Sequence, residues 1–546
     1  MAKQLQTHGY FSCTINDTYT YTSWAWQFID ALKEEIIYPR WTPLNFWGYG
    51  SPTFILYPPL SFYLVAFFNV FTSSVITAMN ITKFLSLFIS ASGMFFLVRE
   101  FYSERIALLS ASFYIFFPFT ILNMYLFGGF ASTISFMWFS PILLFLYRYL
   151  EKRQYKYIFY AGACYGGLIL THLINAYMFT FVILIFVIYM SIVKRRKKDL
   201  IVIPFMTVIG LLVSAAYILP LVYERQFLNI EAFIGEGGGF HFGDFFILPN
   251  LTTKQLPDHF WPVYYNIFVF YVFFFIVLLL LFSYQSIKLR HDITMENAKV
   301  VNHFFIGITV VSIFLLFGIS TSLWETIPFF KYIQFPARWL NIAAYAVIFL
   351  SAVNFLSLDI IYKTKKRHTI TVLLFLVFFL LDFRYINSAP IFTEQELIPV
   401  KSINSTIEHL PAWVDVNKID QNDNSQEKVV IKEGEGKTKI IAWKSAERLI
   451  EITSQNPLTL KIHTFNFPGW KGYIDGVQTE IKTNDGDGTI VINIPGGRHI
   501  LKLIFEDTPI RYYSKHISVF LVITIFAIFI KDPSFVIYRR KKSQLL

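Results

Sequence analysis

Long apolar runs alternate with short polar segments along most of this chain. Each run is close to the about 20 residues that cross a hydrocarbon core as a helix. The clearest runs are 53–72, 75–98, 131–148, 199–221, 263–283, 302–319, 338–358, 369–386 and 516–532. Residues 157–193 hold two more short helices with a hairpin near His172. Since lipid offers backbone groups no hydrogen-bond partner, the pattern predicts an all-α polytopic membrane protein of the helical type.

The N-terminal third admits two arrangements. Runs 53–72 and 75–98 are good spans, but 104–122 is short and interrupted by a proline. If all of them crossed, residues 1–52 would be cytoplasmic. We favour the alternative in which 104–122 is re-entrant or crosses only half-way, because residues 1–52 then lie outside with the other polar loops. This arrangement gives about 11 spans and one short or re-entrant helix.

Charge orients these helices. Of 546 residues, 55% are hydrophobic and only 15% are charged, and the formal net charge is +11. The Lys and Arg residues come in short bursts between apolar runs, which marks cytoplasmic helix ends and argues against a nucleic-acid partner. These bursts are 148–156, 194–198, 363–367 and 539–542.

The pattern predicts four parts, and the lipid bilayer is the first expected partner. They are an extracytoplasmic, aromatic-rich first loop with an amphipathic helix (1–52), a transmembrane helical domain with an outer loop at 222–262 (53–386), an extracytoplasmic region (387–514), and a final transmembrane helix with a basic cytoplasmic tail (515–546).

Residues 387–514 interrupt the membrane pattern. Short runs of alternating apolar and polar residues, such as LTLKIHTF and GTIVINI, are separated by Pro-Gly, Asp-Gly and Gly-Gly turn signals. Asp475 and Gly476 predict a hairpin turn between two strands. We expect an antiparallel β-sandwich over about 425–514 that caps the protein or recognises a ligand and holds no catalytic centre.

The first loop is the most unusual stretch. Residues 1–52 combine many Tyr and Trp residues with Asp17, Arg40 and several prolines. The aromatic rings can stack on sugar faces or anchor the loop among lipid headgroups, and anchoring explains most of them. Asp17 is open to two interpretations, an N-cap for a helix over 18–34 or a functional carboxylate. Asp30 and the two glutamates after it fit the solvated face of an amphipathic helix.

Further ionisable residues recur at the predicted outer ends of helices. They are His172, Glu224, Arg225 and Arg338. Such residues at or inside a membrane are costly and are functional candidates by default. The structural alternatives are a histidine that caps a hairpin and an arginine that reaches phosphate headgroups. Because all fall on the side of the aromatic loop, we expect one outer cavity to gather Asp17, Arg40, His172, Glu224 and Arg338.

Several common site motifs do not occur in the sequence. It has no Walker A, HExxH, GxSxG or CxxC pattern, and Cys13 and Cys164 are far apart. GEGGGF at 235–240 is Gly-rich but falls in an outer loop, where we expect a flexible flap. Asp485 and Asp487 look like part of a calcium loop but lack its downstream Glu, so a plain turn is expected.

Segments spread over nearly the whole chain resemble one known family. They include GYFSCTIND, YPRW, WGYGSPTFILYPPLSFYL, LTHLINAY, AYILPLVYER, QFPARWL and FPGWKGYIDG. In this order they resemble the bacterial and archaeal membrane proteins of the YfhO-like or 6-pyruvoyl-tetrahydropterin-synthase-related family. The pterin name itself receives no support, because none of the 11 histidines lies in a clustered zinc-ligand arrangement.

The resemblance implies a likeness to the GT-C superfamily of membrane glycosyltransferases, which use lipid-linked sugars at the outer face through a first-loop acid. Asp17 matches that acid, and Glu224 stands where a second acidic residue closes the site. The substrate-binding candidates are then Arg40, Tyr57, His172, Arg225 and Arg338.

This sequence departs from the superfamily pattern at two points. The transmembrane helix that usually precedes the acidic loop is missing, so either the short N-terminus is translocated with the first span or the chain lacks an initial helix. The acidic, arginine-containing turn of the superfamily appears here as YLFGGFAST at 125–133, without a charge.

Two classes of function fit these features. The first is an inverting glycosyltransferase of the plasma membrane that moves a sugar from a polyprenyl-phosphate donor to an outer glycan, lipid or protein. Asp17 would act as base or hold a divalent metal, Mg²⁺ or Mn²⁺. The second is a non-enzymatic flippase or accessory protein of envelope assembly. A transporter built from repeats would show internal symmetry, and its absence between the halves favours the transferase.

Overall fold

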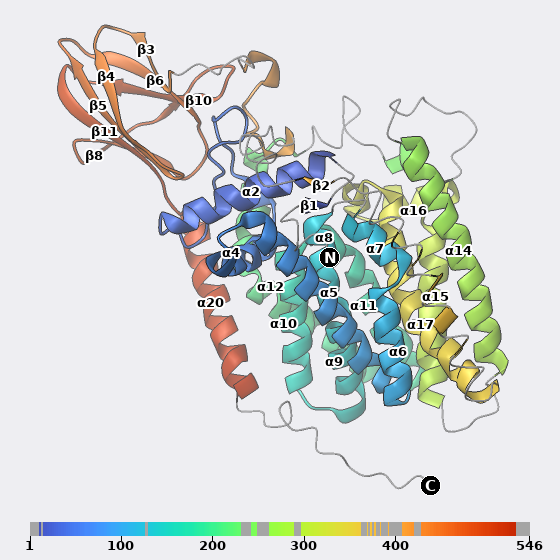
Figure 1. The fold of residues 1–546 in the computed structure, drawn as a ribbon. Helices are drawn as coiled ribbons and strands as arrows, with labels where there is room; N and C mark the ends of the chain where they lie inside the picture. Colours follow the sequence, from blue (N-terminus) through green and yellow to red (C-terminus); the bar gives the residue numbers. More distant parts are fainter. Residues whose placement is uncertain are drawn as a thin grey trace.

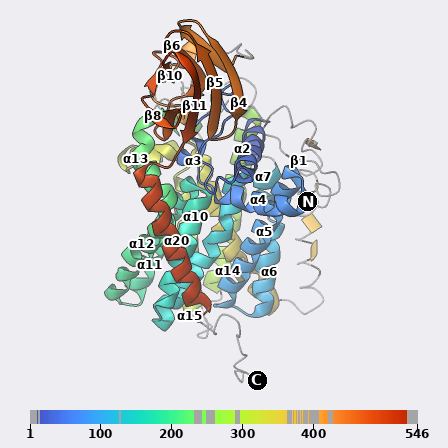
Figure 2. The same ribbon diagram turned by 90° about the vertical axis from the view of Figure 1, so that its left-hand side faces the viewer.

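The computed structural model describes most of the chain in detail. The described residues are 10–11, 15–125, 129–230, 242–247, 261–288, 296–361, 391–392, 407–419 and 427–530, with single positions between 369 and 383. A bundle of long helices forms one part and a β-domain the other, and α20 (Pro509–Ile530) runs down one side of the bundle from the base of the β-domain (Figures 1 and 2). We call the end of the bundle near the β-domain the outer end.

The bundle consists of long apolar helices that run between its two ends and of shorter helices packed with them. They are α5 (Val75–Arg99), α6 (Glu104–Ile115), α7 (Pro118–Tyr125), α8 (Phe130–Ser135), α9 (Phe139–Lys152), α10 (Lys156–Thr171), α11 (Leu173–Val193), α12 (Val202–Val213), α13 (Ala215–Glu224), α14 (Trp261–Lys288), α15 (Glu296–Phe314), α16 (Thr321–Thr326) and α17 (Trp339–Ile361). Within the described part of the chain, 7 helices are long and apolar enough to cross a membrane, or 8 if the bent pair around α12 and α13 is one span. This confirms a polytopic helical membrane protein, and the count of about 11 spans stays a prediction.

One prediction for the N-terminal third is wrong, and a second concerns a segment that is longer than expected. Run 53–72 is not one span but two short helices, α3 (Thr53–Leu56) and α4 (Leu60–Thr72), because two consecutive prolines, 58 and 59, separate them. At 13 residues, α4 is too short for a bilayer core of about 30 Å. Segment Glu104–Tyr125, expected to be re-entrant, is instead 22 residues long and qualifies as a span. Its proline begins α7, where a missing N–H costs little.

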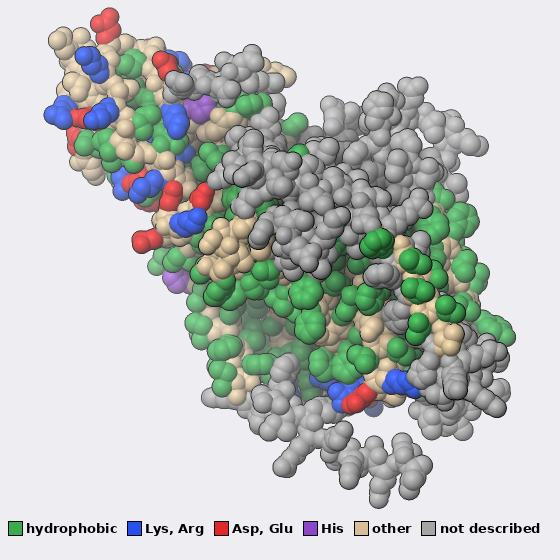
Figure 3. Space-filling model, in the orientation of Figure 1, with side chains coloured by type: hydrophobic (Ala, Val, Ile, Leu, Met, Phe, Trp, Pro, Cys, Tyr) green, Lys and Arg blue, Asp and Glu red, His purple; other side chains and the backbone are tan. Residues whose placement is uncertain are grey.

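Charged residues gather at the end of the bundle opposite the β-domain. Figure 3 shows an apolar belt between the two ends, with Lys, Arg, Asp and Glu side chains below it. Here Arg153 pairs with Asp199, and Lys194 pairs with Glu151. The basic bursts 148–156 and 194–198 therefore meet on one side of the belt. The bursts 363–367 and 539–542, the run 369–386 for the most part and the loop 235–240 lie outside the described residues.

Close helix contacts depend on small residues. A Cβ atom on Gly162 or Gly166 of α10 would lie 2.6 Å from a side-chain atom of Ile209 or Val213 on α12, and one on Gly210 would lie 2.5 Å from Tyr165. Without these glycines the two helices could not approach so closely. Small residues of this kind let helices pack closely in lipid, where burying apolar surface provides no net driving force for helix association.

Helix α2 (Ile15–Lys33) lies across the outer end of the bundle instead of along it (Figure 1). Its buried face carries Trp24 and Phe28, which pack with Phe54, Phe62 and residues of α5 and α8. Strand β1 (Tyr10–Phe11) precedes it and pairs with β2 (Ile391–Phe392). The aromatic first loop thus forms a rigid layer on the bundle.

The β-domain consists of two antiparallel sheets. One has the strand order β3-β6-β10-β9 and the other β4-β5-β11-β7-β8. Their bounds are β3 (Val429–Glu433), β4 (Lys437–Trp443), β5 (Glu447–Ser454), β6 (Leu458–Phe465), β7 (Trp470–Ile474), β8 (Val477–Thr479), β9 (Lys482–Thr483), β10 (Thr489–Ile494) and β11 (Gly497–Phe505). Alternate residues of both sheets, such as Leu460 and Leu501, share one core, which confirms the predicted C-terminal β-sheet domain.

The predicted hairpin is also present. Strands β7 and β8 pair through Ile474 and Val477, and the two turn residues between them have positive φ angles, 50° at Asp475 and 85° at Gly476. Two positive angles suit the right-handed twist of a two-residue hairpin, and Asp-Gly tolerates them.

The loop after α2 joins the first loop to the β-domain in one core. Trp41 packs on Trp470 and Phe505 with ring centroids 5.4 and 5.1 Å apart, and Tyr49 stacks on Phe465 at 4.9 Å. The loop after α2 therefore holds the β-domain against the outer end of the bundle.

Candidate functional site

The first group of candidate residues lies where α20 meets the β-domain. Glu224, the last residue of α13, accepts hydrogen bonds from Nε and Nη2 of Arg511 on α20, both at 2.9 Å. Thr508 donates a third bond to this carboxylate at 2.9 Å. The side chains of Glu224 and Arg511 are 1% and 0% exposed, so this is a fully buried bidentate ion pair. It fixes α13 to α20.

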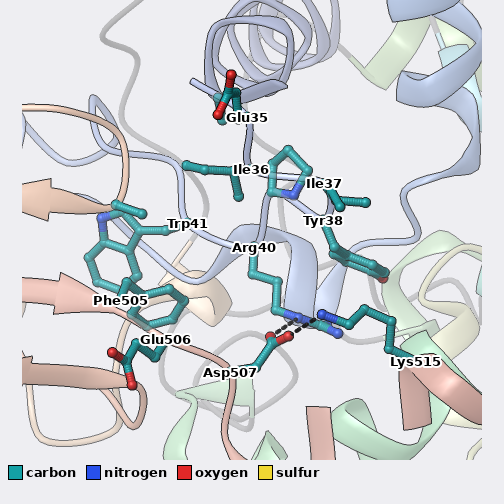
Figure 4. Close-up of a pocket in the computed structure, with 13 residues that line it drawn as sticks. Glu35, Ile36, Ile37, Tyr38, Arg40, Trp41, Phe505, Glu506, Asp507 and Lys515 are labelled. Carbon is teal, nitrogen blue, oxygen red and sulfur yellow. Dashed lines mark hydrogen bonds and ion pairs between the residues drawn. The ribbon is translucent and has the colours of Figure 1, made fainter. Parts of the chain in front are cut away.

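Arg40 belongs to the same group, and Figure 4 shows it beside Asp507 and Lys515. Its Nη2 donates to the carbonyl oxygen of Ala216 at 3.1 Å, and its Nε lies 3.5 Å from a carboxylate oxygen of Asp507. Lys515 on α20 donates to the other oxygen at 2.7 Å. The guanidinium stacks over Tyr38 at 3.8 Å, and burial raises the pKa of that hydroxyl to about 12. We call the following residues the charged base: Arg40, Glu224, Asp507, Arg511 and Lys515.

A cavity of about 240 Å³ opens beside the charged base. Arg40 and Lys515 line it together with Glu35, Glu506 and Asp507. The two cations pair with Asp507, and Glu506 pairs with a lysine of the β-domain at 2.7 Å. Arg40, which sequence reasoning assigned to substrate binding, is therefore paired with a carboxylate of the protein itself.

The second group lies at the outer end of the bundle, where the chain breaks between α10 and α11. His172 has extended backbone angles, φ −157° and ψ 106°, and its Nδ1 accepts the N–H of Asn175 at 3.1 Å. Asn175 in turn donates to the hydroxyl oxygens of Ser132 and Ser135 at 3.0 and 2.7 Å. His172 therefore caps α11, which agrees with the structural alternative for this residue. We call Ser132, Ser135, His172 and Asn175 the polar end cluster.

Arg338 supplies positive charge beside this cluster. It ends the 3₁₀ turn Pro336–Arg338 just before α17, and its Nη1 donates to the carbonyl oxygen of Ile333 at 2.7 Å. The guanidinium lies 5.0 Å from the centre of the Phe335 ring. Its charge acts on the imidazole of His172, so the two side chains lie within electrostatic reach of each other.

Helix α2 reaches the polar end cluster through aromatic contacts. Tyr21 packs against Phe130 at the start of α8 with ring centroids 6.1 Å apart, and its hydroxyl oxygen lies 2.8 Å from that of Tyr57. Phe130 and Ser132 both belong to α8, so this contact packs α2 against the helix that carries two residues of the cluster. Asp17 lies in the first turn of α2, about one helical turn before Tyr21, and its side chain is outside the described residues.

By contact, the candidate residues form two groups. Arg40 and Glu224 belong to the charged base. His172 belongs to the polar end cluster, and Arg338 lies within electrostatic reach of it. Tyr57 packs against Tyr21 and Trp24 of α2. The expectation of one cavity shared by all of them stays a prediction. The sequence analysis expected these residues in one cavity, whereas their contacts place them in two separate groups.

Six residues of these two groups lie outside the predicted set: Ser132, Ser135, Asn175, Asp507, Arg511 and Lys515. Arg511 is the partner of Glu224, and Ser132 and Ser135 are partners of Asn175. An arginine two residues into an apolar helix is costly, and that cost is a signal that could have identified Arg511. The serines carried no signal, because small hydroxyl residues are common in membrane helices. Arg225, just after α13, is exposed.

A metal site was expected through Asp17. Among the described residues, no three His, Cys, Asp or Glu side chains lie close enough to hold a metal ion. The side chain of Asp17 lies outside the described residues, so a metal held through it stays a prediction, and we derive no step through one.

The apolar belt, the aromatic layer across its outer end and the attached β-sandwich define a polytopic membrane protein with a peripheral β-domain. The chain belongs to a family of membrane proteins described as 6-pyruvoyl-tetrahydropterin synthase related domain, whose model matches residues 54–388. This confirms the family that the sequence segments resemble. No curated protein matches the chain.

Two solved structures show a distant likeness. The apo crystal structure of the Archaeoglobus fulgidus oligosaccharyltransferase aligns with a TM-score of 0.41 and 14% identity, over 67% of this chain and 52% of that chain. The present chain thus spans about half the length of that enzyme. Apo ArnT from Cupriavidus metallidurans aligns with a TM-score of 0.25 and 12% identity, over 62% of this chain and 74% of that chain. Neither likeness carries a reaction over to this protein.

Proposed function

We propose that this protein is a membrane glycosyltransferase of the GT-C type, which moves a sugar from a polyprenyl-phosphate donor to an acceptor outside the plasma membrane. The observation that carries the proposal is the course of α2. This helix crosses the outer end of the bundle, and its Tyr21, about one helical turn after Asp17, contacts Phe130 at the start of α8, the helix that carries Ser132 and Ser135. We infer that Asp17 faces the hydroxyl and amide groups of the polar end cluster and Arg338, at the point where a lipid-linked substrate would reach the outer surface.

The reaction assigns a separate task to each charge. The acceptor hydroxyl attacks the anomeric carbon of the donor sugar, the bond from that carbon to the phosphate oxygen breaks, and the polyprenyl phosphate leaves with the bonding electrons. Asp17 accepts the proton of the acceptor hydroxyl. A well-placed general base of this kind contributes about 10²- to 10⁴-fold to the rate. Attack from the face opposite the phosphate inverts the anomeric configuration.

The departing phosphate needs a cation, and Arg338 is the candidate. It stands at the start of α17 within electrostatic reach of His172, and a guanidinium can donate two parallel hydrogen bonds to a phosphate group. Its bond to the carbonyl oxygen of Ile333 uses one nitrogen and orients the group. An Arg338→Lys variant would keep the charge and lose the planar pair of donors.

The isoprenoid tail of the donor would lie against the lipid-facing side of the bundle. Aromatic side chains project there from the two helices that follow the first loop: Phe67 and Phe71 on α4 are 58% and 72% exposed, and Phe84 and Phe88 on α5 are 52% and 58% exposed. A branched hydrocarbon chain packs well on such rings, and both helices begin near α2.

We assign Glu224 to the architecture of the site and not to its chemistry. Its carboxylate is buried and held by Arg511 and Thr508, so it has no free position for an acceptor hydroxyl. A divalent ion held through Asp17 remains part of the proposal only as a point to test by chelation. The acceptor is a glycan, a lipid or a protein.

The experiment is sugar transfer by the full-length protein in nanodiscs. Radiolabelled polyprenyl-phosphate mannose and polyprenyl-phosphate glucose serve as donors, and membrane extract of the producing cells supplies acceptors. Asp17→Asn should lower transfer at least 100-fold, since the amide cannot take the proton. Glu35→Gln, a change of an exposed carboxylate shortly after the same helix, is the matched control and should transfer within twofold of the unmodified protein.

Two results would contradict the proposal. One is an Asp17→Asn protein that transfers sugar at the normal rate. The other is an unmodified protein that transfers no sugar but moves a fluorescent polyprenyl phosphate between leaflets, which would establish the flippase.

A further inference from the structure

A second hollow lies on the outward side of α2, away from the polar end cluster. It has a volume of about 400 Å³, within the range of about 300–1,000 Å³ that is usual for ligand sites. Its walls come from α2, from the loop over residues 43–48 and from the β-domain. Three segments that are far apart in the sequence therefore build one groove.

Two tryptophans line the groove. Trp47 comes from the first loop and Trp443 from the end of β4, and both are half-buried. The buried guanidinium of Arg448 lies 4.5 Å from the centre of the Trp443 ring and steadies it. The exposed ammonium of Lys428 lies 5.2 Å from the same ring. The groove thus offers flat aromatic surface next to a hydrogen-bond donor.

The loop that presents Trp47 is held in a strained conformation. Phe46 and Trp47 have φ angles of 50° and 56°, which L-residues rarely adopt, and Gly48 follows at 89°. His463 on β6 bonds the carbonyl oxygen of Trp47 at 3.0 Å and stacks on Tyr49 at 3.6 Å. Strain of this kind persists only where the surroundings enforce it, and it gathers at functional sites.

Polar groups of α2 complete the groove. Gln27, Asp30 and Glu34 lie on one face of the helix at intervals of three and four residues. The amide of Gln27 holds the loop, since its oxygen accepts the N–H of Leu44 at 2.8 Å. Glu34 accepts the N–H of Ser445 at 2.8 Å and so ties α2 to the β-domain. The carboxylate of Asp30 is half exposed and faces the opening.

The charges along the groove balance. Among the lining residues, Asp30 and Glu34 carry two negative charges, and Lys428 and Lys444 carry two positive charges. Two of these groups also pair with neighbours outside the lining, Asp30 with Lys33 at 3.4 Å and Lys444 with Glu447 at 3.5 Å. A balanced set attracts neither a phosphate nor a cation strongly, but its carboxylate oxygens and ammonium groups can bond many hydroxyl groups. Aromatic faces combined with such groups match a pyranose ring, which has an apolar C–H face and a rim of hydroxyls.

We propose that this groove binds a sugar residue of a neutral oligosaccharide, with Trp47 and Trp443 against the ring faces and Asp30 and Lys428 on its hydroxyls. Its role as the acceptor-docking site rests on the proposed function. Sugar binding itself does not, because it requires neither Asp17 nor the donor. The β-domain would thus recognise the glycan while the helical part carries out the transfer.

The test measures oligosaccharide binding to the full-length protein in nanodiscs. Maltohexaose, chitohexaose and mannohexaose are the probes, and saturation-transfer NMR from aromatic protons reports contact. We expect at least one of them to bind, and Trp443→Ala and Trp47→Ala to weaken that binding at least 10-fold. Trp413→Ala is the matched control: Trp413 is a tryptophan of the β-domain region that is 36% exposed and does not line the groove, and its loss should change binding less than twofold.

Two additional variants keep the test decisive. Asp30→Asn alters an exposed side chain and should fold normally, so a 3- to 10-fold loss of binding is expected even if a tryptophan variant fails to fold. Asp17→Asn should bind the oligosaccharide normally although transfer is lost, which separates this proposal from the proposed function. The proposal is overturned if none of the three oligosaccharides binds the unmodified protein, or if Trp443→Ala and Asp30→Asn both bind as the unmodified protein does.

Discussion

Two polar regions share the outer end of this molecule and are built differently. In the charged base, the carboxylates of Glu224 and Asp507 are matched by nearby arginine and lysine groups. In the polar end cluster, neutral hydroxyl, amide and imidazole groups bond to one another around a helix break. Buried paired charges connect structural elements, whereas the neutral network caps α11 and joins it to α8. The partner of a carboxylate, and not its place at a helix end, therefore distinguishes its role.

The largest expected effect is on the charged base. Glu224→Leu should lower the free energy of unfolding by about 3–5 kcal/mol, because it leaves the guanidinium of Arg511 buried without its counter-ion. Denaturant unfolding in detergent, followed by limited proteolysis between α20 and the β-domain, measures the loss. The double variant Glu224→Leu, Arg511→Met should recover most of it, since no buried charge is left unpaired. A Glu224→Leu protein as stable as the unmodified one would contradict a structural role.

The second effect concerns His409, a buried histidine that would carry a positive charge if it were protonated. His409 is buried against Trp24 of α2, and burial lowers the pKa of its imidazole from 6.5 to about 3. Below pH 6.5 this histidine is therefore protonated in the unfolded chain but stays neutral in the folded chain. The free energy of unfolding consequently decreases as pH falls from 6.5 towards 3. We expect a loss of about 2 kcal/mol between pH 6.5 and 4.5.

A matched variant isolates this histidine. His409→Gln should remove about 2 kcal/mol of the pH dependence between pH 6.5 and 4.5, while carboxylates elsewhere continue to titrate. Unfolding curves at several pH values for the two proteins provide the comparison. Identical pH slopes would show that His409 can be protonated in the folded protein.

The third effect concerns the polar end cluster. Asn175→Ala removes the donor shared by Ser132 and Ser135 and should cost about 1–2 kcal/mol of stability. Asn302→Ala is the matched control, because Asn302 is a buried asparagine that donates to the Tyr102 hydroxyl at 2.7 Å away from this cluster. If the cluster frames the reaction site, only Asn175→Ala should lower sugar transfer more than its loss of folded protein explains. Equal sugar transfer per folded molecule by the two variants would show that the cluster only connects helices and does not frame the reaction site.

Local pattern predicted much of the fold. Apolar run length and charge identified the membrane class, and the period-two segments with Asp475-Gly476 identified the β-domain and one of its hairpins. The failures lie where two local signals compete. Run 53–72 is apolar enough to span but is broken by consecutive prolines, whereas the proline inside 104–125 is harmless because it falls at the first position of a helix.

The candidate site was less accessible to sequence reasoning. Its residue types were informative, since costly ionisable groups at helix ends did mark two polar regions. Their pairing was not, because Arg511 lies 287 positions after Glu224 and only tertiary packing decides whether a carboxylate meets a cation or remains available. The contact of Tyr21 with Phe130, which packs α2 against α8, likewise cannot be predicted from the local sequence.

The most direct test compares two carboxylates in one protein. Sugar transfer per folded molecule and the free energy of unfolding are measured side by side for Asp17→Asn and Glu224→Gln, with the full-length chain in nanodiscs. We predict that Asp17→Asn loses at least 100-fold in transfer and changes stability by no more than about 1 kcal/mol, the value of a helix cap. Glu224→Gln should lose stability while each folded molecule retains most of its transfer. The reverse outcome, with normal transfer by Asp17→Asn and none by a fully folded Glu224→Gln protein, would contradict the assignment of catalysis to the first loop.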